Sequence, residues 1–541
     1  MKKISIKTLL RNRYFFALLG GLMLAVSFPR FNVAGFAWIA PALILFSGFG
    51  KTPRQKFWIG YTAGLAHFLF ALNWLLSIPF PAGAIAAWLA LSGYLAVYLA
   101  IWVWLCWKIF SWITFTNDLK TFAETTWKQR ALWSLFCAAI WVAFEMAMAR
   151  VWSGFPWNFL ATTQYKLTPL LQISSVTGVY GVSFLVVWFS VSLGCAGLLL
   201  VQKPQNRRAC SAEIALPTLT IVLIFSFGFT QISKGKFSDR KIKVALIQPS
   251  IPQTLIFDES QGDSRFAKIM ELSEQALVEK PDLLIWPEAS TPPLDNEKFT
   301  ALTNLVVRHQ VAMILGADDS EKQFDSSGRA ETNYFNSSFF IPPDARSIST
   351  YRKQHLVGFG EYVPLARWLP FMKWLTPIEG GFTAGPHPVQ FQIAEPRAKT
   401  SVLICFEDAF PHYAREHVET DTDFLLNLTN DGWFGKRSAQ WQQAIGAIFR
   451  AIENGLPLVR CTNDGLTCWI DQFGCLRKYF ASQSGDIYGP GFLIAEIPLL
   501  NENEKRAPTF YRQHGDWFGW SCVVIASVLL IATWKRRSSQ G

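Results

Sequence analysis

Long apolar runs dominate the first 232 residues, and one more closes the chain. A helix that crosses a bilayer needs about 20 mostly apolar residues. The windows that meet or approach this length are 14–29, 33–49, 57–78, 84–107, 131–150, 175–201, 212–232 and 517–534. The pattern therefore predicts seven spans followed by an eighth at the C-terminal end. The first two are short and could form a tight hairpin.

Between residues 240 and 515, short strand-like runs alternate with helical patterns. Strands are predicted over 242–247, 283–286, 311–315, 337–341, 402–405, 424–428, 458–460 and 467–471, and helices over 264–279, 296–309 and 439–454. This alternation predicts one layered α/β domain. The polar segment 317–333 reads as a surface loop. The aromatic, Gly/Pro-rich segment 355–396 reads as either a lid or a substrate rim.

The two patterns together predict the domain organisation. Residues 1–239 form a seven-span membrane domain, 240–501 form the α/β catalytic domain, and 502–541 form a linker and the eighth helix with a basic tail. Eighteen Lys and Arg residues fall on the side of the N-terminus, against three (Arg30, Arg150 and Lys166) in the short loops opposite. Because basic loops stay in the cytoplasm, both termini are predicted to be cytoplasmic and the catalytic domain to lie outside, in the periplasm.

Composition agrees with a membrane protein. Only 16% of the 541 residues are charged, whereas soluble domains carry about a quarter. The net charge of +11 is explained by the basic cytoplasmic segments and by attraction to anionic lipid. We therefore expect the bilayer as a partner and no nucleic acid.

The nine cysteines do not form a disulfide framework. No C-x-x-C motif occurs, which argues against zinc and thioredoxin-like chemistry. An oxidising compartment would permit a pairing among Cys461, Cys468 and Cys475, but ordinary strand cysteines are the favoured interpretation.

Three reactive side chains each follow a predicted strand. Cys405 ends the run Thr400–Cys405, Glu288 follows 283–286, and Lys353 follows Tyr351-Arg352. Each has an ordinary structural explanation when it is taken alone. Ligands bind at the carboxyl ends of strands in open α/β sheets, so their joint occurrence points to one site. A thiol, a carboxylate and an ammonium are the groups needed for acyl transfer through a thioester.

The spaced motifs that contain these residues resemble a known family. They are Trp286-Pro287-Glu288, Tyr351-Arg352-Lys353, Phe359-Gly360-Glu361-Tyr362-Val363-Pro364, Ile404-Cys405-Phe406-Glu407, the segment 430–435 (NDGWFG) and the segment 460–465 (RCTNDG). In this order, with this topology, they resemble the nitrilase superfamily and, more narrowly, its membrane branch, the apolipoprotein N-acyltransferases. The resemblance covers the whole chain. It implies a multi-span α-helical membrane domain plus a nitrilase-like αββα sandwich.

The resemblance also implies roles for the residues. Glu288 would be the general base, Lys353 the oxyanion-stabilising cation and Cys405 the nucleophile. Glu361 would orient the lysine and the base, while Phe406 and Glu407 match further positions important for activity. The chain departs from the family pattern at two positions: Gly358 stands where the family has proline, and Phe257 stands where a tryptophan is expected.

The implied reaction is a ping-pong N-acylation. Cys405 would take an acyl chain from a phospholipid and pass it to the α-amine of the diacylglyceryl-cysteine of an apolipoprotein. No cofactor or metal is expected. We expect a monomer in a bacterial inner membrane.

Two other functions stay open from the residues. A membrane-anchored amidase or nitrilase would use water as the acceptor. A lipid transporter or lipoprotein-sorting factor would need no catalysis, but the predicted spans hold almost no ionisable residues besides His67 and Glu145. Glu145 is expected to pair locally with Arg150.

Overall fold

The computed structural model describes residues 12–114, 119–203, 207–235, 237–256, 258–324, 330–364, 381–436, 438–501 and 505–538. The chain divides into two compact units. Unit 1 comprises residues 1–76, 85–233 and 516–541, and unit 2 comprises residues 77–84 and 234–515.

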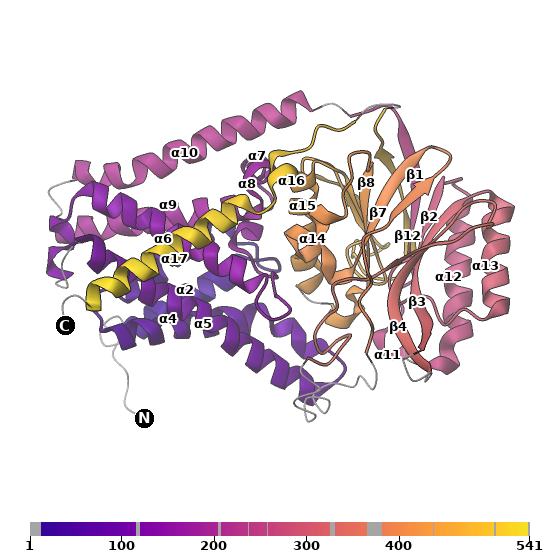
Figure 1. Cartoon of the computed structure of the whole chain (residues 1–541), viewed down its shortest axis with the longest axis horizontal. Coiled ribbons are helices and arrows are strands. Elements are labelled where there is room, and N and C mark those ends of the chain that lie inside the picture. Colours follow the sequence, from indigo (N-terminus) through magenta and orange to yellow (C-terminus); the bar gives the residue numbers. More distant parts are fainter. Residues whose placement is uncertain are drawn as a thin grey trace. The chain divides into compact units, whose positions relative to one another are not determined.

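Unit 1 is built of helices (Figure 1). The longer ones are α2 (Arg13–Val26), α3 (Ala40–Ser47), α4 (Pro53–Ala71), α5 (Pro81–Thr114), α6 (Trp127–Met148), α9 (Val179–Gln202), α10 (Arg207–Lys234) and α17 (Trp517–Ser538). Shorter helical turns are η1 (Ala34–Trp38), η2 (Asn73–Ser77), η3 (Leu119–Glu124), η4 (Leu160–Gln164), α7 (Thr168–Leu171) and α8 (Ser174–Thr177).

Six helices in the described part of the chain are long and apolar enough to cross a membrane. They correspond to six of the eight predicted spans. The first two windows are shorter in the structure: α2 has 14 residues, and the window 33–49 is split into η1 and the eight-residue α3. The split falls at Ile39, and Pro41 lies in the first turn of α3, where proline fits, unlike in the interior of a helix.

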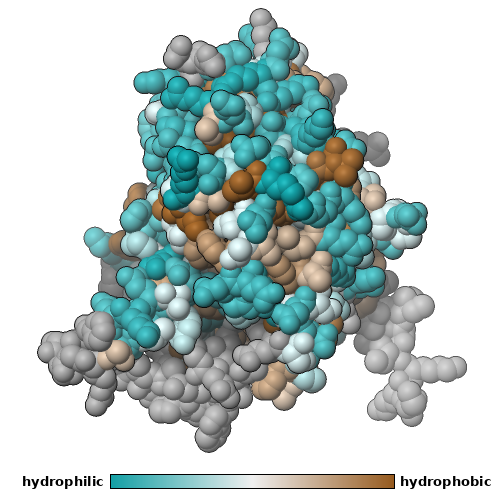
Figure 2. All heavy atoms as spheres, turned by 90° about the vertical axis from the view of Figure 1, so that its right-hand side faces the viewer, coloured by the Kyte–Doolittle hydropathy of each residue, from teal (hydrophilic) through white to brown (hydrophobic). Residues whose placement is uncertain are grey.

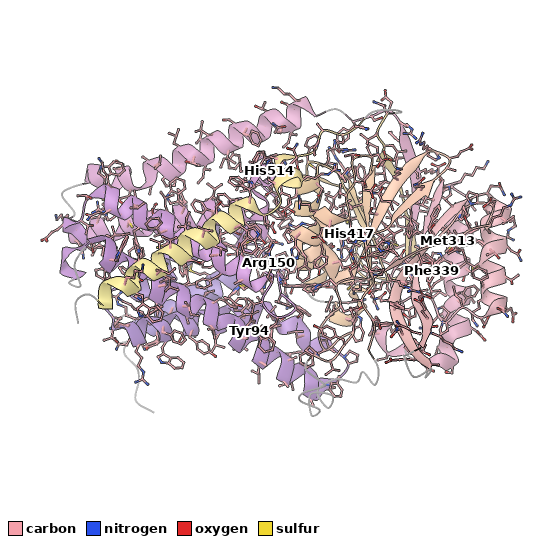
Figure 3. All side chains as sticks on the ribbon, viewed as in Figure 1. Tyr94, Arg150, Met313, Phe339, His417 and His514 are labelled. Carbon is pink, nitrogen blue, oxygen red and sulfur yellow. The ribbon has the colours of Figure 1, made fainter. Side chains whose placement is uncertain are left out.

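Small residues let the helices of unit 1 approach closely. A Cβ on Gly21 of α2 would lie 2.2 Å from the Ala63 carbonyl oxygen of α4, and one on Gly64 would lie 2.7 Å from Ala96 Cα of α5. Such contacts bring helix backbones together where apolar burial gives little driving force. Arg150, labelled in Figure 3, pairs with Asp516 just before α17. The expected pairing of Arg150 with Glu145 is therefore wrong.

Unit 2 contains two six-stranded sheets. The first has the order β12-β1-β2-β3-β4-β5 and the second β11-β10-β9-β8-β7-β6. Their strands are β1 (Lys241–Gln248), β2 (Leu283–Ile285), β3 (Ala312–Phe324), β4 (Ala330–Ile341), β5 (Ser349–Arg352), β6 (Gln390–Ile393), β7 (Ala398–Ile404), β8 (Phe424–Thr429), β9 (Leu458–Thr462), β10 (Cys468–Ile470), β11 (Leu476–Tyr479) and β12 (Gly491–Pro498). The central neighbours β1-β2-β3 and β7-β8-β9 run parallel.

The sheets pack face to face and helices cover their outer faces. One buried cluster joins the two inner faces, for example Val244 and Ile314 with Val402 and Leu426. A second cluster, with Met313, lies beneath α12 (Gly262–Leu277) and α13 (Asn296–His309) (Figures 1 and 3). The second sheet is covered by α14 (Pro411–Glu416) and α15 (Ala439–Asn454), beside the turn η7 (Cys405–Ala409). Unit 2 is thus the expected αββα sandwich.

The remaining elements of unit 2 are short: α11 (Gln253–Ile256), η5 (Glu259–Gln261), η8 (Asp431–Phe434) and α16 (Phe510–His514). The face of unit 2 seen in Figure 2 is mostly hydrophilic, with small apolar groups between polar ones. This surface is that of a domain in contact with water.

The predicted helices 296–309 and 439–454 coincide with α13 and α15. The predicted loop 317–333 was wrong for 317–324 and 330–333, and its residues 325–329 lie outside the described part of the chain. β3 extends to Phe324 and β4 begins at Ala330, and the two arms pair with each other. Their outer parts face solvent on both sides, so a polar composition does not distinguish them from a loop. The edge strands β6, β11 and β12 were not predicted, and within 355–396 the residues 365–380 lie outside the described part of the chain.

Candidate active site

Strand ends of both sheets bring the three reactive side chains to one place. Glu288 follows β2, Lys353 directly follows β5, and Cys405 follows β7 as the first residue of η7. Cys405 has a φ of 54°, the left-handed region that non-glycine residues rarely occupy. Such backbone strain persists only where neighbouring contacts hold it, and it is concentrated at functional sites.

The Glu288 carboxylate is buried and hydrogen-bonded on both oxygens. Asn336 Nδ2 donates to Oε1 at 2.8 Å, and the Asn430 backbone N–H donates to Oε2 at 2.9 Å. The carboxyl group and the Cys405 thiol are close enough for each to shift the pKa of the other. Burial raises the pKa of Glu288 above its usual range, while the Lys353 ammonium opposes this shift. A buried carboxylate with a raised pKa is a stronger proton acceptor than an exposed one.

Lys353 is an ammonium held between two carboxylates. Its Nζ donates to Glu361 Oε1 at 2.8 Å and lies 3.6 Å from Glu288 Oε1, and only 1% of the residue is exposed. Burial lowers the pKa of Lys353, but the negative charges of Glu361 and Glu288 outweigh it and the net shift is upward. Glu361 is fixed in turn by Asn336 Nδ2 and by the Val357 backbone N–H, both at 2.8 Å. Lys353 therefore stays charged at a fixed position.

The Cys405 thiol is kept protonated at rest. Burial and the Glu288 charge raise its pKa, whereas Lys353 and a hydrogen bond with Thr429 lower it. The net shift is upward. A thiol reacts as its thiolate, so a sulfur with a raised pKa would need a neighbouring base in order to react. Glu288 is in that position.

Glu407 ties the segment after Lys353 to the segment before Cys405. Its Oε1 accepts the backbone N–H groups of Gln354 at 2.8 Å and His355 at 3.0 Å, and its Oε2 accepts that of Ile404 at 2.7 Å. The Tyr351 hydroxyl donates to the same fully buried carboxylate. Glu407 thus acts on the geometry of the site and has no free oxygen for proton transfer.

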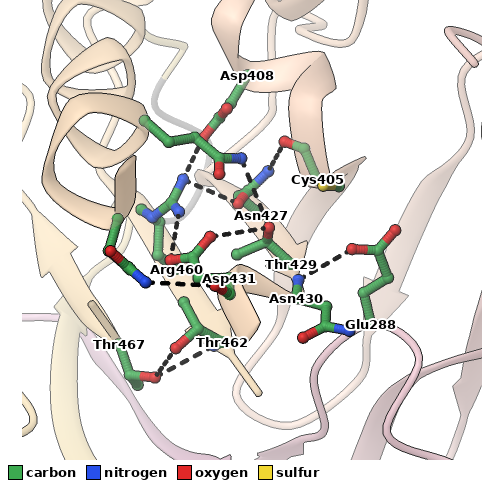
Figure 4. A network of polar contacts seen from close by, with 12 residues as sticks. Glu288, Cys405, Asp408, Asn427, Thr429, Asn430, Asp431, Arg460, Thr462 and Thr467 are labelled. Carbon is green, nitrogen blue, oxygen red and sulfur yellow. Dashed lines mark hydrogen bonds and ion pairs between the residues drawn. The ribbon is translucent and has the colours of Figure 1, made fainter. Parts of the chain in front are cut away.

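A second buried network lies next to Cys405 (Figure 4). Asn427 Nδ2 donates to the Cys405 carbonyl oxygen at 3.0 Å, and Arg460 Nη1 donates to Asn427 Oδ1 at 3.1 Å. The Arg460 guanidinium also pairs with Asp408 and with Asp431, all of them fully buried. Burial raises the pKa of Asp408 to about 6 and of Asp431 to about 7, against the lowering effect of Arg460. This network supports the strained turn at Cys405.

Several residues of the site were not identified from the sequence. Asn336 bridges Glu288 and Glu361, but it lies at an ordinary position in β4. The Asn430 backbone N–H and the Thr429 hydroxyl come from the end of β8, where a polar Asn-rich segment was the available signal.

Phe406 packs edge-on against Phe410 at a centroid distance of 5.1 Å.

Of the two positions that depart from the family pattern, only Gly358 lies among the described residues. Gly358 bridges to Tyr362 in the turn that carries Glu361, whereas Phe257 lies outside the described residues. The turn at Gly358 therefore forms without the proline.

Other cysteines and charges of unit 2 have structural roles. Cys461 and Cys468 are buried free thiols in β9 and β10, as the strand-cysteine interpretation predicted, and Cys475 is half-buried just before β11. Arg450 and Glu453, three residues apart on α15, form an ion pair at 2.7 Å. The described residues contain no group of three His, Cys, Asp or Glu side chains arranged for a metal ion.

Comparison with known proteins decides the family. Residues 20–192 match the apolipoprotein N-acyltransferase N-terminal domain, and residues 243–496 match the carbon-nitrogen hydrolase family. An apolipoprotein N-acyltransferase of Geobacter metallireducens is 32% identical over 98% of this chain and 96% of its own length. The chain belongs to the apolipoprotein N-acyltransferase family. A second relative, from Vibrio vulnificus, is 30% identical over 96% of both chains.

The solved structures include an amidase from Nesterenkonia sp., 15% identical, with a TM-score of 0.35, covering 49% of this chain and 93% of its own. The family membership makes this chain an acyltransferase with a nitrilase-type domain. Its six apolar helices and its relatives indicate an inner-membrane protein.

Proposed function

We propose that this acyltransferase moves an acyl chain from a phospholipid to the α-amine of the diacylglyceryl-modified N-terminal cysteine of an apolipoprotein. The reaction passes through a thioester on Cys405, with Glu288 as the base and Lys353 as the oxyanion-stabilising cation. The observation that carries the proposal is the half-buried Cys405 thiol close to the buried Glu288 carboxylate, beside a fixed ammonium. The acceptor is supported by the relatives, which are apolipoprotein N-acyltransferases.

In the first half-reaction, Glu288 takes the thiol proton as Cys405 Sγ attacks the ester carbonyl carbon of the phospholipid. The S–C bond forms and the ester C–O bond breaks. The leaving lysophospholipid oxygen receives the proton back from Glu288. A raised pKa suits Glu288 to both steps, since it accepts a proton and releases it again.

The tetrahedral intermediate carries a negative oxygen that must be stabilised without water. Lys353 Nζ is fixed by Glu361 within 3.6 Å of Glu288, so the ammonium lies beside the atoms that react. One fixed donor of this kind lowers the barrier by about 3–4 kcal/mol. Because the lysine is already held in place, no reorganisation is required when the charge develops.

In the second half-reaction, the acceptor amine attacks the thioester carbonyl carbon. The N–C bond forms, the S–C bond breaks, and the amine loses a proton to Glu288, which returns it to the Cys405 sulfur. Amide product and free thiol result, so the two halves together consume no proton.

We further propose a topology and an assembly state. Residues 1–239 form the membrane domain, 240–501 the periplasmic catalytic domain, and 502–541 the linker and last span, with both termini in the cytoplasm. The basic-residue asymmetry of the loops supports this orientation. The protein acts as a monomer, since one chain supplies every member of the proposed site.

The test is intact-protein mass spectrometry of the purified chain incubated with phospholipid. We expect one acyl adduct on the wild type and on Cys475→Ala, a matched control at a half-buried cysteine, and none on Cys405→Ala. Adding a diacylated peptide should remove the adduct and yield the N-acyl peptide. An adduct on Cys405→Ala would refute the nucleophile, and free fatty acid in place of acylated peptide would identify a hydrolase.

A further inference from the structure

Two ionisable side chains from separate apolar helices meet at one cavity in unit 1. His67 of α4 and Glu145 of α6 both line a cavity of about 30 Å³, together with Asn158. The three residues are 2%, 4% and 8% exposed. Ionisable groups in apolar helices are costly to bury and are associated with function.

Structural hydrogen bonds use only one oxygen of Glu145. Its Oε1 accepts the Trp141 indole N–H at 3.0 Å, the Leu160 backbone N–H at 2.8 Å and the Ser183 hydroxyl at 3.0 Å. These three donors fix the carboxyl group in one orientation. Among the described residues Oε2 has no hydrogen-bond partner.

The other polar groups that line the cavity also lack hydrogen-bond partners among the described residues. His67 Nδ1 and both side-chain polar atoms of Asn158 have no partner in the described part of the chain. Buried polar atoms are costly unless they are hydrogen-bonded, and here they share one cavity. Three acceptors are therefore available in it: Glu145 Oε2, Asn158 Oδ1 and, in the Nε2–H tautomer, His67 Nδ1.

We propose that this cavity binds a primary ammonium group. Such a group has three N–H donors for three acceptors, and its charge balances the Glu145 carboxylate. Aromatic side chains, including Trp102, Trp141 and Phe68, form much of the wall and favour a cation over their faces. A water molecule needs about 10–15 Å³, so 30 Å³ holds an ammonium group and its first carbon but not a whole lipid headgroup.

Two aromatic residues that line the cavity also reach the surface of unit 1. Of the residues that line it, Tyr98 and Phe144 are partly exposed and the others are buried. Their rings meet edge-on at a centroid distance of 5.9 Å, and the Tyr98 hydroxyl hydrogen-bonds to that of Tyr94 on the outer surface of α5. Two sources carry a primary ammonium in a membrane: an ethanolamine phospholipid headgroup and the α-amine of a lipid-modified peptide.

The test titrates the detergent-solubilised full chain with lipids and measures retention by native mass spectrometry. Cys405→Ala protein is used, so that no turnover occurs and the result does not depend on the proposed thioester. An ethanolamine phospholipid should bind at least about tenfold more tightly than the choline lipid with the same acyl chains, which has no N–H donor. This comparison needs no change in the cavity.

Variants and a peptide then separate the outcomes. With Glu145→Gln added, the ethanolamine and choline lipids should bind with nearly equal affinity. Glu124→Gln, the same change at an exposed position in unit 1, should keep the preference for the ethanolamine lipid. If a diacylated peptide with a free α-amine displaces the lipid and its N-acetylated form does not, the acceptor is a source of the ammonium. If neither peptide displaces it, the headgroup is the source. Equal binding of both lipids and of both peptides, or an unchanged preference in Glu145→Gln, would overturn the proposal.

Discussion

Replacing Glu407 by glutamine tests whether this buried carboxylate fixes the geometry of the nucleophile. One carboxylate accepts three backbone N–H groups and one hydroxyl. A glutamine side chain keeps the size but turns one oxygen into an NH₂ group. Whichever way the amide turns, that NH₂ faces at least one backbone N–H.

The less costly orientation loses the bond to the Ile404 N–H and keeps those to Gln354 and His355. A hydrogen bond to a charged group contributes about 1.5–3 kcal/mol, and the kept bonds now go to a neutral acceptor. The total loss is thus about 2–4 kcal/mol. Ile404 directly precedes Cys405, so the strained turn itself is released.

A misplaced sulfur raises the activation barrier of acylation. If about 1.4 kcal/mol of the lost stabilisation raises that barrier, acylation slows about tenfold. We expect Glu407→Gln to form the Cys405 adduct at least tenfold more slowly and to unfold at a lower temperature. The assay follows adduct mass with time under excess phospholipid. Glu416→Gln, an exposed position in α14, serves as the control. A folded Glu407→Gln protein that acylates within twofold of wild type would refute the positioning role.

Two further predictions concern pH. In Asn336→Ala, Glu288 loses a hydrogen bond that lowers its pKa. The acidic limb of the pH–rate profile for acylation should therefore move to higher pH. An unmoved limb would exclude Glu288 as the base. In Arg460→Met, Asp408 and Asp431 lose their cation and unfolding should become about 3–5 kcal/mol easier at neutral pH. Their folded pKa values, about 6 and about 7, lie above the unfolded value near 3.9, so ionisation opposes folding increasingly as pH rises. The deficit should be smallest below about pH 4 in denaturant titrations, and a deficit independent of pH would contradict this account.

Hydrophobic patterning by itself determined most of the organisation of the chain. Apolar windows located the six long helices, and alternating short runs located the central parallel strands, because a buried strand or span must be continuously apolar. Glu288 and Cys405 were recognisable because their chemistry interrupts apolar runs, whereas Lys353 follows a mostly polar strand and stood out through the motif Tyr351-Arg352-Lys353. Edge strands such as β11 and the outer arms of β3 and β4 face solvent, so their composition carries no such signal.

Tertiary structure decided which polar groups meet. Asn336 joins Glu288 to Glu361, and Arg460 supports Cys405 through Asn427, although these pairs lie far apart along the chain. Sequence singled out His67 and Glu145 as ionisable residues in apolar helices, but only helix packing brings both to one cavity. A hydrogen bond depends on atomic positions within a few tenths of an ångström, and those are fixed by how the sheets and helices pack, not by local sequence preference.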